Sequence, residues 1–153
     1  MHLSTRGRYA VMAMLDLAQM QSEAEAPTVQ KPVTLAEIAE RQEISLSYLE
    51  QLFARLRRAS LVKSIRGPGG GYVLSASPEN TWLSDIINAV DEPMSVTRCG
   101  KPTSKQDGAK GCVGGKRCNA HQLWAALGEH IELFMQNVSL RMVLDDVVSG
   151  GQP

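Results

Sequence analysis

The feature that most restricts the fold of this chain is a glycine-rich hexapeptide between two short β-like runs. The hexapeptide is RGPGGG at residues 66–71, and the flanking runs are residues 61–65 and 72–75. Proline and clustered glycines end regular structure and favour a tight reversal of the chain. We therefore expect an antiparallel β-hairpin with a tip where the backbone can approach a partner closely.

Helical patterns precede this hairpin. Residues 4–21 are apolar over most of a helical surface, which predicts a buried helix. Thr34 and Glu37 have the spacing of a capping box, in which the first and fourth residues bond each other's backbone. They predict the start of a second helix, which ends near residues 41–43.

A third helix is expected to begin at Ser45 or Ser47, and Ser47 with Glu50 has the spacing of a second capping box. Its inward face recurs at helical spacing and carries Leu49, Leu52, Phe53 and Leu56. Two short helices, a tight turn and a β-hairpin follow one another in the order of a winged helix-turn-helix. A plain helical hairpin is the alternative, and the basic hairpin rim argues against it.

The rest of the chain divides into a short helix, a long loop and further helices. Residues 83–90 have a helical pattern, whereas the loop that follows is rich in Gly, Pro, Lys and Ser and has no period. A long helix is expected at 119–137, and Ser139 should cap a final short helix carrying Val147. The units expected are a DNA-binding domain (1–90), a loop (91–118), C-terminal helices (119–148) and a frayed tail (149–153).

The third helix carries side chains suited to reading DNA. Hydroxyl and amide groups on an exposed helix reach base edges in the major groove, and here they belong to Ser45, Ser47, Tyr48 and Gln51. Glu50 is repelled by phosphates but accepts a hydrogen bond from cytosine N4, so we interpret it as a specificity filter. Tyr48, Gln51, Arg55 and Arg58 are expected to share one outer stripe.

Basic residues cluster locally, although the chain has 16 Lys and Arg against 16 Asp and Glu. Residues 55–66 hold five basic residues and no acid, and such patches favour phosphate binding. At the edge of the hairpin tip, Arg66 is expected to enter a minor groove, and Arg8 is a weaker candidate for a phosphate contact. A nucleotide-binding loop at 67–71 is the alternative, but the phosphate-loop and dinucleotide patterns are absent.

Three cysteines and a histidine form a second group of candidate site residues. Cys99, Cys112, Cys118 and His121 are separated by 12, five and two residues. Thiolates with an imidazole bind either an iron–sulfur cluster or structural zinc. From the spacing alone both metals stay open, as do redox thiols and unpaired loop cysteines. The last two residues, three apart at the start of a helix, can point the same way.

Other features bear on location and on function class. No segment is long and apolar enough to span a membrane, and the N-terminal residues lack the order of a signal peptide. We therefore expect a cytoplasmic chain with reduced thiols. No C-x-x-C pair, cofactor fingerprint or catalytic Cys–His–Asp arrangement is apparent, so we expect a regulator and not an enzyme.

Several stretches resemble the winged-helix family of IscR-like iron–sulfur cluster regulators. They are residues 3–18, 44–57 and 66–74, and AVDEPMSVTRC, which ends at Cys99 and is followed by the other three ligand candidates. The resemblance implies a mainly α winged-helix homodimer with a long C-terminal dimerisation helix. It also implies a [2Fe–2S] cluster held by Cys99, Cys112, Cys118 and His121. The implied DNA-contacting positions are Ser45, Ser47, Tyr48, Glu50, Gln51 and Arg66.

The resemblance also implies how such a protein acts. Its relatives bind imperfect palindromes in double-stranded DNA, as repressors or activators, and control genes for iron–sulfur cluster assembly. Cluster occupancy changes the sites that are bound, and cluster-donating proteins are possible partners. Our hypothesis is that the cluster ties the loop to the dimer helix and repositions the DNA-binding heads.

One departure from the family pattern is the gap between Cys99 and Cys112, which is longer than the expected C-x5-C. Closing a longer loop costs little free energy, so we expect cluster binding to survive. The alternatives are a [4Fe–4S] cluster, a regulator that senses nitric oxide, iron or redox state, and a zinc-binding interaction module.

Overall fold

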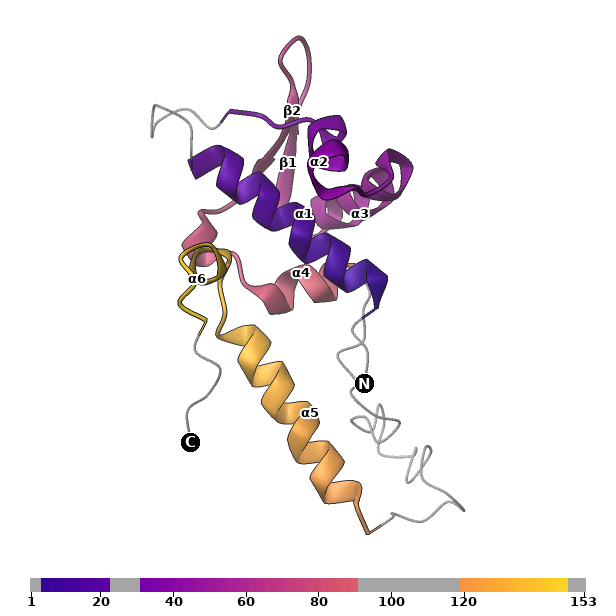
Figure 1. Cartoon of the computed structure of the whole chain (residues 1–153), viewed down its shortest axis with the longest axis vertical. Coiled ribbons are helices and arrows are strands. Elements are labelled where there is room, and N and C mark those ends of the chain that lie inside the picture. The colour runs from indigo at the N-terminus through magenta and orange to yellow at the C-terminus, as the bar shows by residue number, and fades with distance from the viewer. Residues whose placement is uncertain (1–3, 23–30, 91–118, 149–153) are drawn as a thin grey trace.

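The computed structural model describes residues 4–22, 31–90 and 119–148, and the expected cysteine ligands lie outside these ranges. Its elements are α1 (Thr5–Ser22), α2 (Leu35–Gln42), α3 (Leu46–Arg58), β1 (Val62–Ile65), β2 (Gly71–Leu74), the 3-10 helix η1 (Pro78–Asn80), α4 (Leu83–Ala89), α5 (His121–Gln136) and α6 (Leu140–Leu144). Figure 1 shows a head formed by α1–α4 and the β-hairpin, from which α5 projects.

The helix-turn-helix unit begins and ends at local caps. The Thr34 hydroxyl accepts a bond from the backbone N–H of Glu37 (3.3 Å), and the Glu37 carboxylate accepts one from the backbone N–H of Thr34 (2.8 Å). This confirms the expected capping box. Helix α2 then ends at Gln42, and its C-cap Glu43 is left-handed (φ 53°) and donates its backbone N–H to the Ala39 carbonyl.

Helix α3 starts at Leu46, with Ser45 as its cap. The Ser45 hydroxyl accepts a bond from the backbone N–H of Tyr48 at 3.3 Å. The prediction that Ser47 and Glu50 form a second capping box was therefore wrong. Because Ser45 already occupies the cap, Ser47 lies inside the first turn, where its backbone is helical.

The core lies between α1 and the helices packed on it. Helix α1 contacts α2, α3, α4 and α6, and its small side chains Ala10 and Ala13 are fully buried. The inward face predicted for α3 is confirmed, because each of its four members is at most 2% exposed. Burying a side chain of this size stabilises the fold by about 1.5–3 kcal/mol.

Strands β1 and β2 pair in an antiparallel hairpin that projects from the head (Figure 1), with Val62 opposite Leu74 and Ile65 opposite Gly71. The strands lie within one residue of the runs expected from the sequence. At the tip Gly67 and Gly69 adopt positive φ angles of 99° and 71°, which favour glycine. The glycine-rich segment therefore joins two strands and leads into no helix, unlike a nucleotide-binding loop.

Two contacts fasten the hairpin to the head. Val33 forms a backbone bridge with Tyr72, with N–H···O distances of 3.0 Å and 2.7 Å in the two directions. The Tyr72 ring also packs edge-on against Phe53 of α3, with a centroid separation of 4.9 Å. The hairpin is thus held in a defined direction relative to α3.

The C-terminal helices follow the sequence prediction with one exception. Ser139 caps α6 by accepting the Met142 backbone N–H (3.3 Å), as expected. Helix α6 ends at Leu144, so Val147, which was expected on it, lies beyond the helix and is 57% exposed. Backbone bonds from Leu83 to Val138 and from Leu140 to Thr81 join this region to the start of α4. None of the helices in the described ranges is long and apolar enough to cross a membrane.

Candidate nucleic-acid interface and metal ligands

The polar side chains at the start of α3 are presented to solvent. Ser45, Ser47, Glu50 and Gln51 are all exposed. The Ser45 oxygen accepts the helix cap, yet its O–H proton can still be donated to a partner. Since the opposite face of α3 is closed by the core, these groups form the outer surface of its first two turns.

Tyr48 and Arg55 differ from this exposed set, because both are half-buried. The Tyr48 ring packs edge-on against Tyr9 of α1, with a centroid separation of 5.9 Å and an interplanar angle of 86°. The outer stripe expected from spacing is therefore fully exposed only at Gln51 and Arg58. A step of 100° per residue places the other two members beside the buried face.

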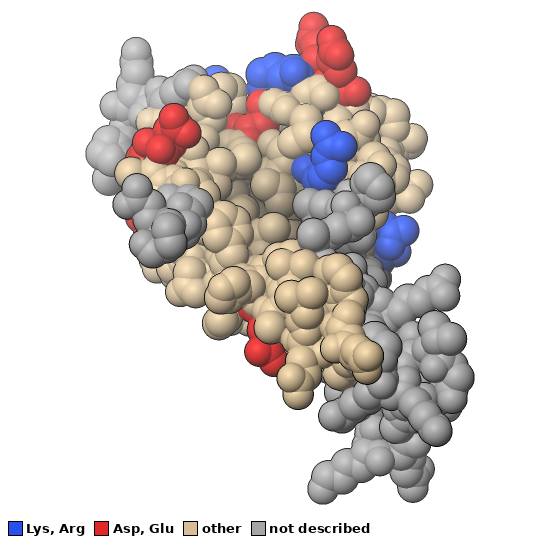
Figure 2. Space-filling model, turned by 60° about the horizontal axis from the view of Figure 1, so that its bottom comes forward, with Lys and Arg blue, Asp and Glu red and all other residues tan. Residues whose placement is uncertain are grey.

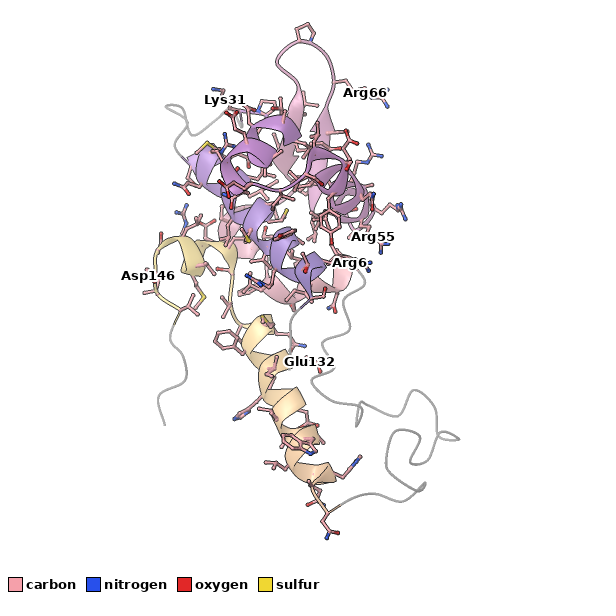
Figure 3. The ribbon with its side chains drawn as sticks, turned by 45° about the vertical axis from the view of Figure 1, so that its right-hand side comes forward. Arg6, Lys31, Arg55, Arg66, Glu132 and Asp146 are labelled. Carbon is pink, nitrogen blue, oxygen red and sulfur yellow. The ribbon has the colours of Figure 1, made fainter. Side chains whose placement is uncertain are left out.

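Basic side chains line one side of the head. In Figure 3, Arg66 on the hairpin, Arg55 on α3 and Arg6 on α1 all point to this side. Arg66 is exposed at the edge of the glycine-rich tip, as expected, and Arg8 is exposed in the first turns of α1. Arg6 also donates to the Val90 carbonyl at 3.5 Å. This side of the head can therefore receive phosphate groups.

An ion pair that sequence reasoning missed holds α2 against α1. Asp16 is 6% exposed and accepts bonds from Arg41 Nη2 (2.8 Å), Arg41 Nε (3.0 Å) and Gln42 Nε2 (3.0 Å). The hydrogen bond to Asp16 raises the pKa of Arg41 above its usual value. Asp16 is the one acid in residues 4–21, on a helix whose surface is mostly apolar, and that was the available signal. The pair orients the end of α2 just before the turn into α3.

Of the four metal-ligand candidates, only His121 lies in the described residues. It is half-buried at the first position of α5, while Cys99, Cys112 and Cys118 lie outside. Within the described ranges no three His, Cys, Asp or Glu side chains come together as a metal site. The relative placement of the four ligands is thus a prediction that the structure leaves untested.

The start of α5 fits an anionic group. Ala120 is its cap and provides no side-chain hydrogen bond, and no acid occupies the first turn. The N–H groups of a helix's first turn and the positive end of the helix dipole favour negative charge there. Thiolates and imidazole are ligands of iron–sulfur clusters and of zinc alike, so the donor set suits either.

Helix α5 leaves a long apolar surface uncovered. None of its residues is buried, and Leu123, Trp124, Leu133 and Phe134 are 62%, 39%, 54% and 38% exposed. Figure 2, in which this end of the molecule comes forward, shows a broad surface of uncharged residues. Exposed apolar patches of this kind mark sites of association.

Comparison with known proteins identifies relatives along nearly the whole chain. The HTH-type transcriptional regulator IscR of Xenorhabdus nematophila is 49% identical over 140 residues, which cover 92% of this chain and 77% of that protein. The IscR of Serratia proteamaculans is 47% identical over 146 residues, covering 95% of this chain and 80% of the relative.

Solved structures show the same architecture. CymR (YrzC), the global cysteine regulator of B. subtilis, superposes with a TM-score of 0.73 at 29% identity, covering 95% of this chain and 98% of CymR. T. potens IscR gives a TM-score of 0.70 at 34% identity, with coverages of 100% and 94%. These matches confirm the winged-helix fold.

The family model named Rrf2, described as iron-dependent transcriptional regulator, matches residues 3–146. That span includes the helix-turn-helix, the hairpin, the cysteine segment and both C-terminal helices. Together with relatives at almost half identity, this match shows that the chain belongs to the Rrf2 family of iron-dependent transcriptional regulators.

Proposed function

We propose that this regulator binds double-stranded DNA as a homodimer, and that an iron–sulfur cluster changes which sites it binds. The observation that carries the proposal is the first turns of α3, whose polar side chains are exposed beside a projecting glycine-rich hairpin. In winged helix-turn-helix proteins the corresponding helix enters the major groove with its N-terminal residues toward the bases. No catalytic role is needed for this activity.

Each group of exposed residues has a part in this proposal. Ser45, Ser47 and Gln51 offer hydrogen bonds to base edges, with the half-buried Tyr48 beside them, and Glu50 rejects sites where it finds no donor. Arg66 enters a minor groove from the hairpin. Arg8 and Arg55 contact phosphates, which sets the position of the head and adds affinity without sequence preference.

The partner proposed for α5 is a second copy of the chain. A helix of 16 residues is about 24 Å long, and its apolar stripe is uncovered in one copy. Two copies packed along it would bury this stripe in both and relate the two heads by a two-fold axis. A two-fold pair of heads would bind an imperfect palindrome.

The cluster ligands we propose are Cys99, Cys112, Cys118 and His121. We favour a [2Fe–2S] cluster because of the resemblance to IscR-like regulators, with a [4Fe–4S] cluster or zinc as alternatives. When bound, the cluster would make the protein responsive to iron and redox state. The imidazole of His121 replaces a thiolate, which lowers the negative charge of the site and raises its reduction potential. The positive end of the α5 dipole, where no acid occupies the first turn, would stabilise the remaining negative charge.

The proposed organisation follows these roles. Residues 1–90 bind DNA, 91–118 hold most of the cluster ligands, 119–148 form the dimer and 149–153 are a tail. The IscR relatives are named as transcriptional regulators, and the resemblance to IscR-like regulators implies control of cluster-assembly genes, which we propose as the role of this chain. It would act in the cytoplasm beside the DNA and receive its cluster from donor proteins.

The cluster proposal is tested by purifying the protein without oxygen and recording its absorption spectrum. We expect a brown protein with sulfide-to-iron charge-transfer bands, whose shape separates the two cluster types. His121→Ala should weaken or shift these bands, whereas His130→Ala, which changes an exposed histidine on the same helix, should not. A colourless protein after reconstitution with iron and sulfide, carrying zinc instead, would contradict the cluster and favour the zinc module.

The DNA proposal is tested by selecting bound duplexes from a random pool, separately for the cluster-loaded and the cluster-free protein. We expect imperfect palindromes in both selections and a class of sites found only with the loaded form. Identical selections from the two forms would contradict control by the cluster. If neither form enriches any sequence, DNA recognition itself is wrong.

The dimer is tested by sedimentation of the cluster-free protein. Leu123→Lys places a charge on the apolar stripe of α5 and should shift the protein toward monomer. Gln136→Lys adds the same charge at an exposed position of α5 that lies about 140° around the helix from Leu123, and it should leave the dimer intact. Equal behaviour of the two variants would contradict dimerisation through this stripe.

A further inference from the structure

One apolar residue of α3 does not belong to its buried face. Leu46 is 42% exposed, while the core residues of the same helix are at most 2% exposed. It occupies the first position of α3, between the cap Ser45 and the exposed Ser47. A large aliphatic side chain therefore stands at the end of the helix that the proposed function directs toward DNA.

Local packing does not account for this leucine. The apolar pair that often fixes the entry into a helix joins the residue before the cap to the fourth helical residue. Those positions are Ile44 and Leu49, which are 4% and 0% exposed. The entry into α3 is thus already closed by two other side chains, and Leu46 lies outside that contact.

The chemistry of base edges offers one apolar group in the major groove, the C5-methyl of thymine. The other groups presented there are hydrogen-bond donors and acceptors, which an aliphatic side chain cannot satisfy. An exposed leucine beside serine hydroxyls would bury its surface only against that methyl. Against any other base pair it would leave polar groups without a partner.

We propose that Leu46 is a specificity-determining residue that recognises a thymine methyl in each half of the DNA site. The inference rests on the proposed function, since it requires α3 to enter the major groove. Leu46 and Glu50 are separated along the helix axis by about 6 Å, more than one base-pair step of about 3.4 Å. Leu46 therefore contacts a different base pair from the one that Glu50 tests.

The test replaces thymine by uracil, which removes only the methyl group. A duplex obtained from the selection is synthesised with uracil at one thymine position at a time, and binding is measured by fluorescence anisotropy. Burying one methyl is worth about 0.8 kcal/mol, so we expect one position per half-site at which uracil weakens wild-type binding about fourfold. Leu46→Ala should bind the thymine and uracil duplexes equally.

Ile65→Ala is the matched control, because Ile65 is an aliphatic residue of similar exposure (46%) on the hairpin and not on α3. It should keep the dependence on the thymine methyl. Leu46→Gln, which keeps the side-chain length, should lose that dependence as Leu46→Ala does. Circular dichroism and thermal unfolding verify that each variant is folded.

Three results would overturn the inference. They are a wild-type protein indifferent to every uracil substitution, a Leu46→Ala variant that keeps the wild-type ratio, and an Ile65→Ala variant that loses it. If the wild-type protein selects no duplex at all, the proposed function fails as well. Normal DNA selection without a methyl effect would refute the role of Leu46 alone.

Discussion

Removing the Asp16 carboxylate should destabilise the head more than any exposed substitution on α2. The change is Asp16→Asn, which keeps the volume of the side chain and removes its charge. In the structure this carboxylate is 5% exposed and accepts four N–H contacts of 2.8–3.2 Å from Arg41 and Gln42. The asparagine retains one acceptor and turns an N–H donor toward the guanidinium.

The magnitude follows from the burial of the two partners. Removing one partner of a fully buried ion pair costs about 3–5 kcal/mol. The Arg41 side chain is 35% exposed, so its charge regains part of its hydration when the pair is broken. We therefore expect Asp16→Asn to lower the free energy of unfolding by about 2–3 kcal/mol, below the fully buried case.

The assay is urea unfolding at pH 7, followed by circular dichroism at one protein concentration, because dimerisation couples stability to concentration. A double-mutant cycle with Arg41→Gln should give a coupling energy of about 1–2 kcal/mol. Glu40→Gln, at an exposed position of the same helix, should change stability by less than about 0.5 kcal/mol. The reasoning is refuted if the coupling is near zero or if Asp16→Asn costs no more than Glu40→Gln.

Four other changes have defined outcomes. Glu50→Ala should let the cluster-free protein bind sites that the wild type binds only with the cluster, as measured by gel shift. An unchanged site preference would contradict the role of Glu50 in specificity. Thr34→Ala should cost about 1 kcal/mol in urea unfolding, because it removes the cap acceptor of α2. The hydrogen bond from the Thr34 backbone N–H lowers the pKa of Glu37 below its usual 4.5. The stabilisation from Glu37 is therefore present above pH 4.5 and is lost as the pH falls through the lowered pKa. The difference in unfolding free energy between the wild type and Glu37→Ala should shrink in acid over the same range. Gly71→Ala would bring a Cβ to 2.5 Å from the Val33 carbonyl oxygen, so the bridge should open at a cost of about 1–3 kcal/mol, visible as faster amide exchange of Val33.

Features governed by neighbours in the sequence were predictable. The caps at Thr34 and Ser139 and the buried face of α3 follow from spacings of three and four residues, which the chain itself displays. The error at Ser47 has the same local origin. Two serines two residues apart, Ser45 and Ser47, both suit a cap, and one hydrogen bond decides between them.

Features that depend on distant residues were not predictable in this way. Asp16 and Arg41 are 25 residues apart, and nothing in either local pattern pairs them. The exposure of Leu46 depends on which apolar residues the core already accommodates. The cysteine ligands come from a stretch without helical or strand period, so only their residue types and the family resemblance indicate what they bind.

Helix α1 makes no base contact in the proposed function, yet its side chains contact both α3 and the β-hairpin, the elements that make those contacts. These contacts are Arg6 to the Val90 carbonyl, Tyr9 to Tyr48 of α3, Asp16 to Arg41 of α2, and Gln21 Oε1, which accepts the Leu74 backbone N–H of β2 at 3.3 Å. Each contact holds a different neighbour, so α1 sets the angle between α3 and the hairpin. Val90 is the last described residue before the cysteine segment. Val90 is also the C-cap of α4, which contacts both α1 and α3. A displacement of Val90 would therefore act on α3, the helix that carries Leu46 and Glu50, directly through α4 as well as through α1 and the Tyr9–Tyr48 contact.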